Sequence, residues 1–164
     1  MPLAVKRGTG PLAPVKAAVF LVARRADIIG AAEDELTSRS PKYLAAEPVT
    51  HDRLISLYEK LVESLAARDP LPLLEHARQT ATERFHAGYD LSEVQKAYNA
   101  VEEAIWSRVF SEDLPEKYAV ILPSVSAAIG GAKDELAREY VRLAAGAHAP
   151  VVDIAALFRG GERP

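Results

Sequence analysis

Apolar residues recur at intervals of three and four along almost the whole chain, and no segment alternates apolar with polar residues. The first spacing places apolar side chains on one side of successive helices, whereas a half-buried strand needs alternation. No Asn-Gly hairpin signal is present either. The sequence therefore predicts an all-α, single-domain bundle of five long helices plus a short C-terminal helix, with a globin-like arrangement as one alternative.

Proline and glycine mark where the helical region begins and ends. Three prolines and two glycines among the first fourteen residues predict a flexible arm over residues 1–13. Pro14 suits the first turn of a helix, and we expect this first helix to continue to Thr37. The helical region should span residues 14–146, followed by a short C-terminal helix and tail over residues 147–164.

Capping residues predict the later boundaries. Thr50 is expected to cap the second long helix, because Ser, Thr, Asp and Asn are the preferred N-cap residues. Gly88 should end the third, since glycine readily adopts the left-handed conformation found at helix ends. Asp90 with Glu93 has the spacing of a capping box. By the same reasoning, Asp113 is expected to cap the last long helix.

The last long helix carries the longest apolar stripe of the chain. Its seven-residue pattern is typical of helices that pair with another helix, and Pro123 should kink it. This stripe is longer than one seam inside a bundle requires. We therefore expect a surface shared with a second copy, formed by Tyr118, Ile121, Val125, Ile129, Leu136 and Tyr140.

Charge and composition exclude several classes of protein. A net charge of −3, with Lys and Arg interspersed among Asp and Glu, gives no basic stripe for a nucleic acid. The absence of cysteine excludes disulfides, thiol nucleophiles and thiolate metal sites. The most apolar run, residues 15–23, contains Lys16 and is well short of the roughly 20 residues that span a membrane. We expect a cytoplasmic protein with no nucleic-acid or membrane partner.

Residues that could carry chemistry are few. Glu83 and His86 have the Glu-x-x-His spacing of di-iron bundles, but no second such motif exists. Glu83 and His76 are expected to face water, opposite an inward stripe of Leu74, Ala77, Ala81 and Phe85. No nucleophile elbow is present. The residues therefore predict no metal, no cofactor and no enzymatic activity.

Arg78 lies only about 40–50° from that inward stripe, at about 100° per residue. A guanidinium in such a place should reach a carboxylate, and Glu102 of the next helix is the hypothetical partner. An alternative is a pocket between the helices around Phe85, Tyr98 and Trp106. Such a pocket would hold a small ligand, a lipid or a haem.

The stretch from residue 76 to residue 106 resembles the N-terminal helical domain of the RsbT co-antagonist (RsbR/RsbRD-type) regulators. The resemblance extends over roughly residues 18–143, but its motifs are mostly caps and helix stripes. The family pattern has a His-x-Arg helix start, a Gly-aromatic-x-Leu turn and a tyrosine in the following helix. The matching residues here are His76, Arg78, Gly88, Tyr89, Leu91, Glu93 and Tyr98.

This resemblance implies a sensory or scaffolding domain that dimerises and passes a signal to a STAS, kinase or other output domain. It supplies no catalytic residues. Only about twenty residues follow Leu143, so we expect the chain to act through a separate partner or as a free-standing dimer. The prediction is a non-enzymatic, homodimeric regulatory domain of bacterial stress or two-component type signalling. The alternative is a small-ligand or cofactor sensor.

Overall fold

The computed structural model describes residues 12–45 and 47–148. Within these ranges the chain forms seven helices and no strand, which confirms the predicted all-α class. Their bounds are α1 Ala13–Ala23, α2 Arg25–Arg39, α3 Pro41–Ala45, α4 Glu47–Ala67, α5 Leu71–His86, α6 Leu91–Ser111 and α7 Pro115–His148. The predicted short C-terminal helix and most of the predicted N-terminal arm lie outside the described residues.

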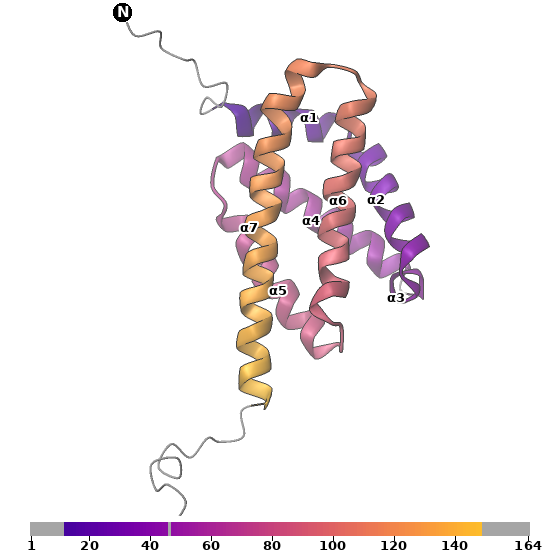
Figure 1. The fold of residues 1–164 in the computed structure, drawn as a ribbon, viewed down its shortest axis with the longest axis vertical. Helices are drawn as coiled ribbons and strands as arrows, with labels where there is room; N and C mark the ends of the chain where they lie inside the picture. The colour runs from indigo at the N-terminus through magenta and orange to yellow at the C-terminus, as the bar shows by residue number, and fades with distance from the viewer. Residues whose placement is uncertain (1–11, 46, 149–164) are drawn as a thin grey trace, which may run out of the picture.

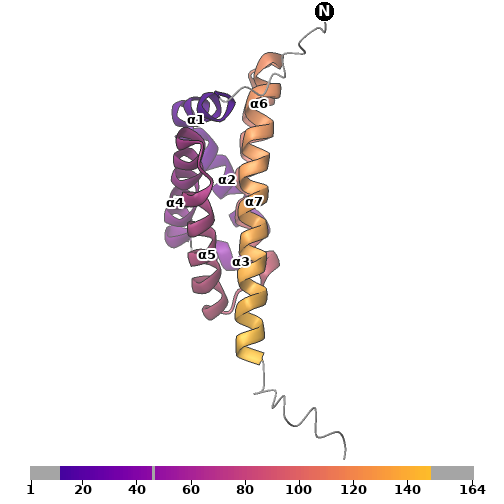
Figure 2. The same ribbon diagram turned by 90° about the vertical axis from the view of Figure 1, so that its left-hand side faces the viewer.

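The long helices form a bundle in which α4 and α5 lie on one side and α6 and α7 on the other (Figure 2). Helix α1 crosses one end of the bundle, and α2 returns along α6 (Figure 1). Helix α7 packs against α5, α1 and α6. One continuous apolar core joins all seven helices, as expected when each helix has one apolar side to bury. None of the described helices has the length and apolar character needed to cross a membrane.

The predicted first helix is divided in two at Arg24. No proline or glycine stands close to Arg24 in the sequence to signal this break. Arg24 leaves the helical conformation, with φ −121° and ψ 18°. Its Nε and Nη2 each donate to Glu112 at 2.6 Å, and its guanidinium lies 3.8 Å from the Phe20 ring centroid. The ion pair joins residues 88 positions apart. Local sequence therefore could not reveal the bend.

The prediction that Thr50 caps a helix is wrong. Thr50 lies within the first turns of α4, which begins at Glu47, and its hydroxyl donates to the Tyr43 carbonyl at 3.0 Å in a buried position. Pro48 is compatible with this earlier start, because the first N–H groups of a helix have no partner within the helix. The hydroxyl thus ties α4 to the short helix α3.

The turn between α5 and α6 follows its prediction, whereas the next turn does not. Gly88 has φ +81°, and Asp90 with Glu93 forms a capping box in which the Asp90 N–H donates to Glu93 Oε2 at 3.3 Å. Asp113 instead adopts the left-handed conformation, with φ 47°, directly after α6. Aspartate tolerates this conformation better than most residues. Asp113 therefore belongs to the end of α6, and does not cap α7.

Candidate functional site

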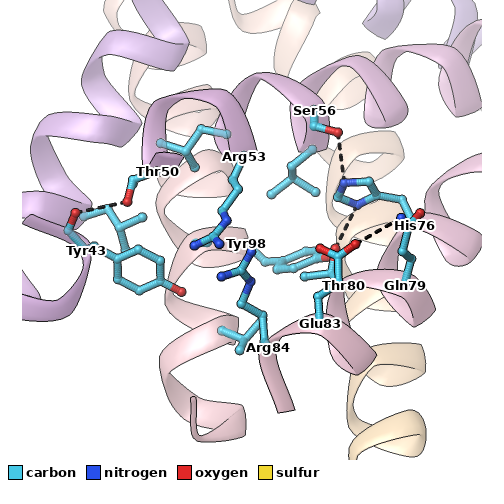
Figure 3. A pocket seen from close by; sticks show the side chains of 15 residues that line it. Tyr43, Thr50, Arg53, Ser56, His76, Gln79, Thr80, Glu83, Arg84 and Tyr98 are labelled. Atoms are coloured by element: carbon cyan, nitrogen blue, oxygen red, sulfur yellow. Dashed lines mark hydrogen bonds between the residues drawn. The ribbon is translucent and has the colours of Figure 1, made fainter. Parts of the chain in front are cut away.

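A cavity of about 180 Å³ lies between α4, α5 and α6 and is closed at one side by α2 and α3. Figure 3 shows the side chains that line it. Its apolar wall consists of Leu36, Leu54, Leu57, Val94 and Ala97. Its polar lining consists of Tyr43, Thr50, Arg53, Ser56, His76, Gln79, Thr80, Glu83, Arg84 and Tyr98. Five helices contribute to the cavity, so only the assembled bundle creates it.

Two arginines of the lining face one another. Arg53 extends from α4 and Arg84 from α5, and their guanidinium groups point toward each other across the cavity (Figure 3). Arg84 is buried, at 6% exposure, and its guanidinium lies 5.4 Å from the Tyr89 ring centroid. Burial, followed by repulsion from Arg53, lowers the pKa of Arg84. Both groups stay cationic near neutral pH, because arginine is effectively always protonated.

Tyr98 supplies a buried hydroxyl to the same cavity. The residue is 1% exposed, and its Oη has no hydrogen bond of normal geometry within the described part of the chain. Burial raises the pKa of Tyr98 to about 12, and a hydrogen-bonding contact with the Thr80 side chain, outside normal geometry, acts in the opposite direction. The hydroxyl therefore keeps its proton at neutral pH and is available as a donor. Buried hydroxyl groups usually have a partner, and the contact available to this one within the described residues is with Thr80.

His76 lies on the opposite side of the cavity from Tyr43 (Figure 3). Its Nε2 is 3.2 Å from the Ser56 hydroxyl, and its Nδ1 is 3.5 Å from the Thr80 hydroxyl. Burial, reinforced by Lys60 and opposed by Glu83, lowers the pKa of this imidazole. The ring is therefore neutral at neutral pH. The prediction that His76 lies on the outward side of its helix is wrong, because its side chain lines the cavity.

The lowered pKa of His76 predicts a loss of stability in mild acid. Unfolded His76 binds a proton near its ordinary pKa of about 6.5, whereas the folded protein binds it only at lower pH. Between these two values the unfolded chain binds more protons, so the free energy of unfolding falls as pH is lowered. The free energy of unfolding should therefore be lower at about pH 5.5 than at about pH 7.5, and His76→Gln should make this drop smaller. Urea denaturation at the two pH values measures the free energy of unfolding.

His86→Gln is the matched control for this measurement. His86 is exposed at the end of α5, and its ring nitrogen lies 3.0 Å from the Thr82 carbonyl, away from the cavity lining. His86→Gln removes an imidazole outside the cavity, so His76→Gln should reduce the pH dependence by more than this control does. An equal pH dependence in His76→Gln and in the wild type would contradict the assignment to His76.

The predicted inward stripe of α5 is displaced by one residue at each end. Leu73, Ala77, Ala81 and Arg84 are buried, whereas Leu74 and Phe85 are only half-buried. Choosing the more apolar residue favoured Phe85 over Arg84, whereas Leu73 and Leu74 are identical in type and polarity could not separate them. The buried stripe contains a charged residue, and helical spacing from Leu73 is the signal that could have identified it. Arg84 was missed for this reason, whereas Arg53 belongs to α4.

The predicted pairing of Arg78 with Glu102 is also wrong. Arg78 Nε donates to Glu135 of α7 at 2.7 Å. Glu102 instead accepts from the Ser126 hydroxyl at 3.5 Å. Arg78 is turned away from the cavity because the buried stripe of α5 is displaced. The Arg78 ion pair therefore ties α5 to α7.

The other residues predicted around a pocket are dispersed. Tyr98 lines the cavity, but Phe85 and Trp106 do not. Phe85 makes an edge contact with Tyr140, with ring centroids 5.7 Å apart. Trp106 is 37% exposed on the outer side of α6. Among the residues that the structure describes, no group of three or more His, Cys, Asp or Glu side chains could hold a metal ion.

The apolar stripe of α7 packs inside a single chain. The side chains of Ile121, Val125, Ile129, Leu136 and Tyr140 are buried by the other helices. The Tyr140 hydroxyl donates to the Tyr89 carbonyl at 2.8 Å. Of the six residues expected at a dimer surface, Tyr118 alone is half-buried. A second copy cannot reach the other five while the bundle is intact.

A family model for the N-terminal domain of the RsbT co-antagonist protein rsbRD matches residues 26–150. The match covers more than half of the 164 residues. The chain belongs to this family. The rsbRD N-terminal domain match includes α2 to α7, except for Arg25, and with them every residue that lines the cavity. It confirms the resemblance seen in the sequence, and membership of this family suggests a regulatory role in stress signalling.

No curated protein and no solved structure matches the chain. The globin-like alternative therefore stays a prediction.

Proposed function

We propose that this rsbRD N-terminal domain is a non-enzymatic, homodimeric regulator of bacterial stress signalling that works in the cytoplasm. It acts through contacts with a second copy and with a separate STAS- or kinase-type partner. Family membership supports the signalling role. The exposed aromatic residues of α6 are the observation that supports the contacts.

Two such residues, Trp106 and Phe110, form an aromatic face together with the half-buried Tyr118 of α7. The ring centroids of Trp106 and Phe110 are 5.7 Å apart, and those of Phe110 and Tyr118 are 4.8 Å apart. Trp106 is 37% exposed and Phe110 is 48% exposed. An aromatic side chain buries about 150–250 Å² when it is covered. Leaving these rings in water therefore forgoes a large hydrophobic stabilisation.

A second copy is the occupant that we propose for the aromatic face. Trp106 and Phe110 are four residues apart and so lie one above the other on α6. A compact patch of this kind can pack against its own copy about a two-fold axis, which is the commonest symmetry of soluble oligomers. Aromatic residues are enriched at the centres of such interfaces. The proposed surface includes Tyr118 but not the five buried residues of α7.

Phe110→Asp should weaken dimerisation about thirtyfold or more, because a central aromatic residue commonly contributes 2 kcal/mol or more to an interface. Sedimentation equilibrium at several concentrations measures the change. Val141→Asp is the matched control, since Val141 is 68% exposed on α7 and lies outside the aromatic face. It should leave the dissociation constant unchanged.

A wild-type protein that is monomeric at high micromolar concentration would contradict the homodimer. An unchanged dissociation constant in Phe110→Asp would contradict this face. The signalling role is tested in the native bacterium by deleting the coding region and measuring a stress-response reporter. Val141→Asp should restore the response, and Phe110→Asp should not.

A further inference from the structure

We propose that the cavity between α4, α5 and α6 binds a small monocarboxylate, whose carboxylate lies between Arg53 and Arg84. The ligand would have an apolar body about the size of a benzene ring. This site would give the regulator a chemical input, and it does not depend on the dimer proposed above. The cavity involves the first half of α6, around Val94 and Tyr98, whereas the aromatic face involves its second half.

The charge of the lining is the first argument. Neither Arg53 nor Arg84 has a carboxylate within ion-pair distance among the residues that the structure describes. Arg84 is also buried, since only 6% of its surface is exposed. In the same ranges, seven arginines do pair with carboxylates: Arg24, Arg25, Arg39, Arg78, Arg108, Arg138 and Arg142. Burying a charge without a partner is costly. A ligand carboxylate between the two guanidiniums would remove this cost.

The geometry also suits a carboxylate. The guanidinium is a planar group with a fork of N–H donors that matches the two oxygens of a carboxylate. Arg53 and Arg84 present two such groups from different helices toward one point (Figure 3). The buried Tyr98 hydroxyl adds a neutral donor to the same cavity. All three groups therefore favour an acceptor that carries negative charge.

Glu83 is the acidic residue of the lining, and it does not neutralise the pair of arginines. Glu83 is exposed at the edge of the cavity, and its Oε1 accepts from Gln79 Nε2 at 3.1 Å. His76 is neutral at neutral pH, for the reason given above. Two cations against one anion leave the lining with a net positive charge of one. A single negative charge on the ligand balances it.

Size and apolar lining limit the rest of the ligand. An apolar cavity of about 150 Å³ in a protein can hold one benzene molecule, and this cavity measures about 180 Å³. Drug-sized ligands and nucleotides need roughly 300–1,000 Å³. The side chains of Leu54, Leu57 and Val94 form part of the apolar wall. A short aliphatic or aromatic monocarboxylate fits both conditions.

The direct experiment is calorimetric titration of the full chain with sodium hexanoate and with sodium benzoate, in a buffer of low chloride concentration. We expect binding of one molecule per chain. 1-Hexanol tests whether binding requires the negative charge, because it keeps the apolar body without the carboxylate. Inorganic phosphate tests whether binding requires the apolar body, because phosphate is negatively charged but has no apolar body. 1-Hexanol should bind at least about tenfold more weakly than hexanoate, since a hydrogen bond to a charged group contributes about that factor. Phosphate should also bind at least about tenfold more weakly, since each buried CH₂ group that it lacks contributes about 0.8 kcal/mol.

Three variants test the residues. Arg84→Met and Arg53→Met should each weaken hexanoate binding at least about tenfold, and Tyr98→Phe should weaken it by a smaller factor. Arg78→Met is the matched control, because Arg78 is on the same helix as Arg84 but pairs with Glu135 outside the cavity. Arg53 is only half-buried, so Arg53→Met keeps the test valid if Arg84→Met does not fold.

Weaker binding in the cavity variants, with unchanged binding in Arg78→Met, would support the proposal. Equal affinity for 1-hexanol would overturn the role of the two arginines. Tighter binding of phosphate than of hexanoate would overturn the apolar half of the proposal. Absence of binding by both carboxylates at millimolar concentration would overturn the site as a whole, and would leave the proposed dimer unaffected.

Discussion

Leu136→Ala is expected to lower the free energy of unfolding by about 2–5 kcal/mol, the range found for buried leucines. Leu136 is fully buried where α7 packs into the core. Its replacement removes apolar contacts and leaves a cavity that the surrounding helices fill only in part. Urea denaturation followed by far-UV circular dichroism measures the change.

Substitution by aspartate separates the two interpretations of the α7 stripe. Leu136→Asp should prevent folding, because it buries a carboxylate without a partner. Val141→Asp introduces the same charge on the same helix at a side chain that is 68% exposed, and should change the free energy of unfolding by less than about 0.5 kcal/mol. If Leu136→Asp folded normally and only dissociated into monomers, the stripe would be a dimer surface, contrary to its burial within one chain.

Tyr58→Phe is expected to cost about 1–2 kcal/mol of stability, because it deletes one buried hydrogen bond. The Tyr58 hydroxyl donates to the Leu21 carbonyl at 2.6 Å and thereby ties α4 to α1. Leu21 also accepts from the Arg24 N–H at 3.2 Å. This second bond keeps the carbonyl from losing all its partners and limits the cost. Thermal and chemical denaturation should agree on the change.

Tyr98→Phe provides a matched control for that prediction. Both tyrosines are 1% exposed, but the Tyr98 hydroxyl has no hydrogen-bond partner of normal geometry in the described part of the chain. Its removal should leave stability unchanged or raise it, because a buried hydroxyl without a partner is itself unfavourable. A loss as large as that of Tyr58→Phe would show that the Tyr98 hydroxyl makes a stabilising hydrogen bond, for which Thr80 is the candidate.

The cavity concentrates the departures from ordinary packing in this bundle. A buried arginine without a carboxylate and a buried hydroxyl without a hydrogen bond of normal geometry both lower stability. Such departures are expected at functional sites, where they are retained for a reason other than stability. The predicted gain or neutrality of Tyr98→Phe, together with its weaker hexanoate binding, would show this trade-off directly.

The local features of the sequence predicted the helices and several of their ends. Helical spacing of apolar residues indicated the all-α class, and Gly88, Asp90 and Glu93 indicated the turn between α5 and α6. These features act over a few neighbouring residues, so they can be recognised without knowledge of the partner helices.

The tertiary structure decided which side of each helix is buried and which residues meet. Neighbouring residues of a helix point about 100° apart. Because Leu73 and Arg84 are buried in place of Leu74 and Phe85, the observed cavity has a different lining from the predicted pocket. The bend at Arg24 depends on Glu112, 88 residues away. Arg53 and Arg84 face one another only because α4 and α5 pack together. Local periodicity determines that a helix forms, but contacts between distant segments select its buried side and thereby create the cavity.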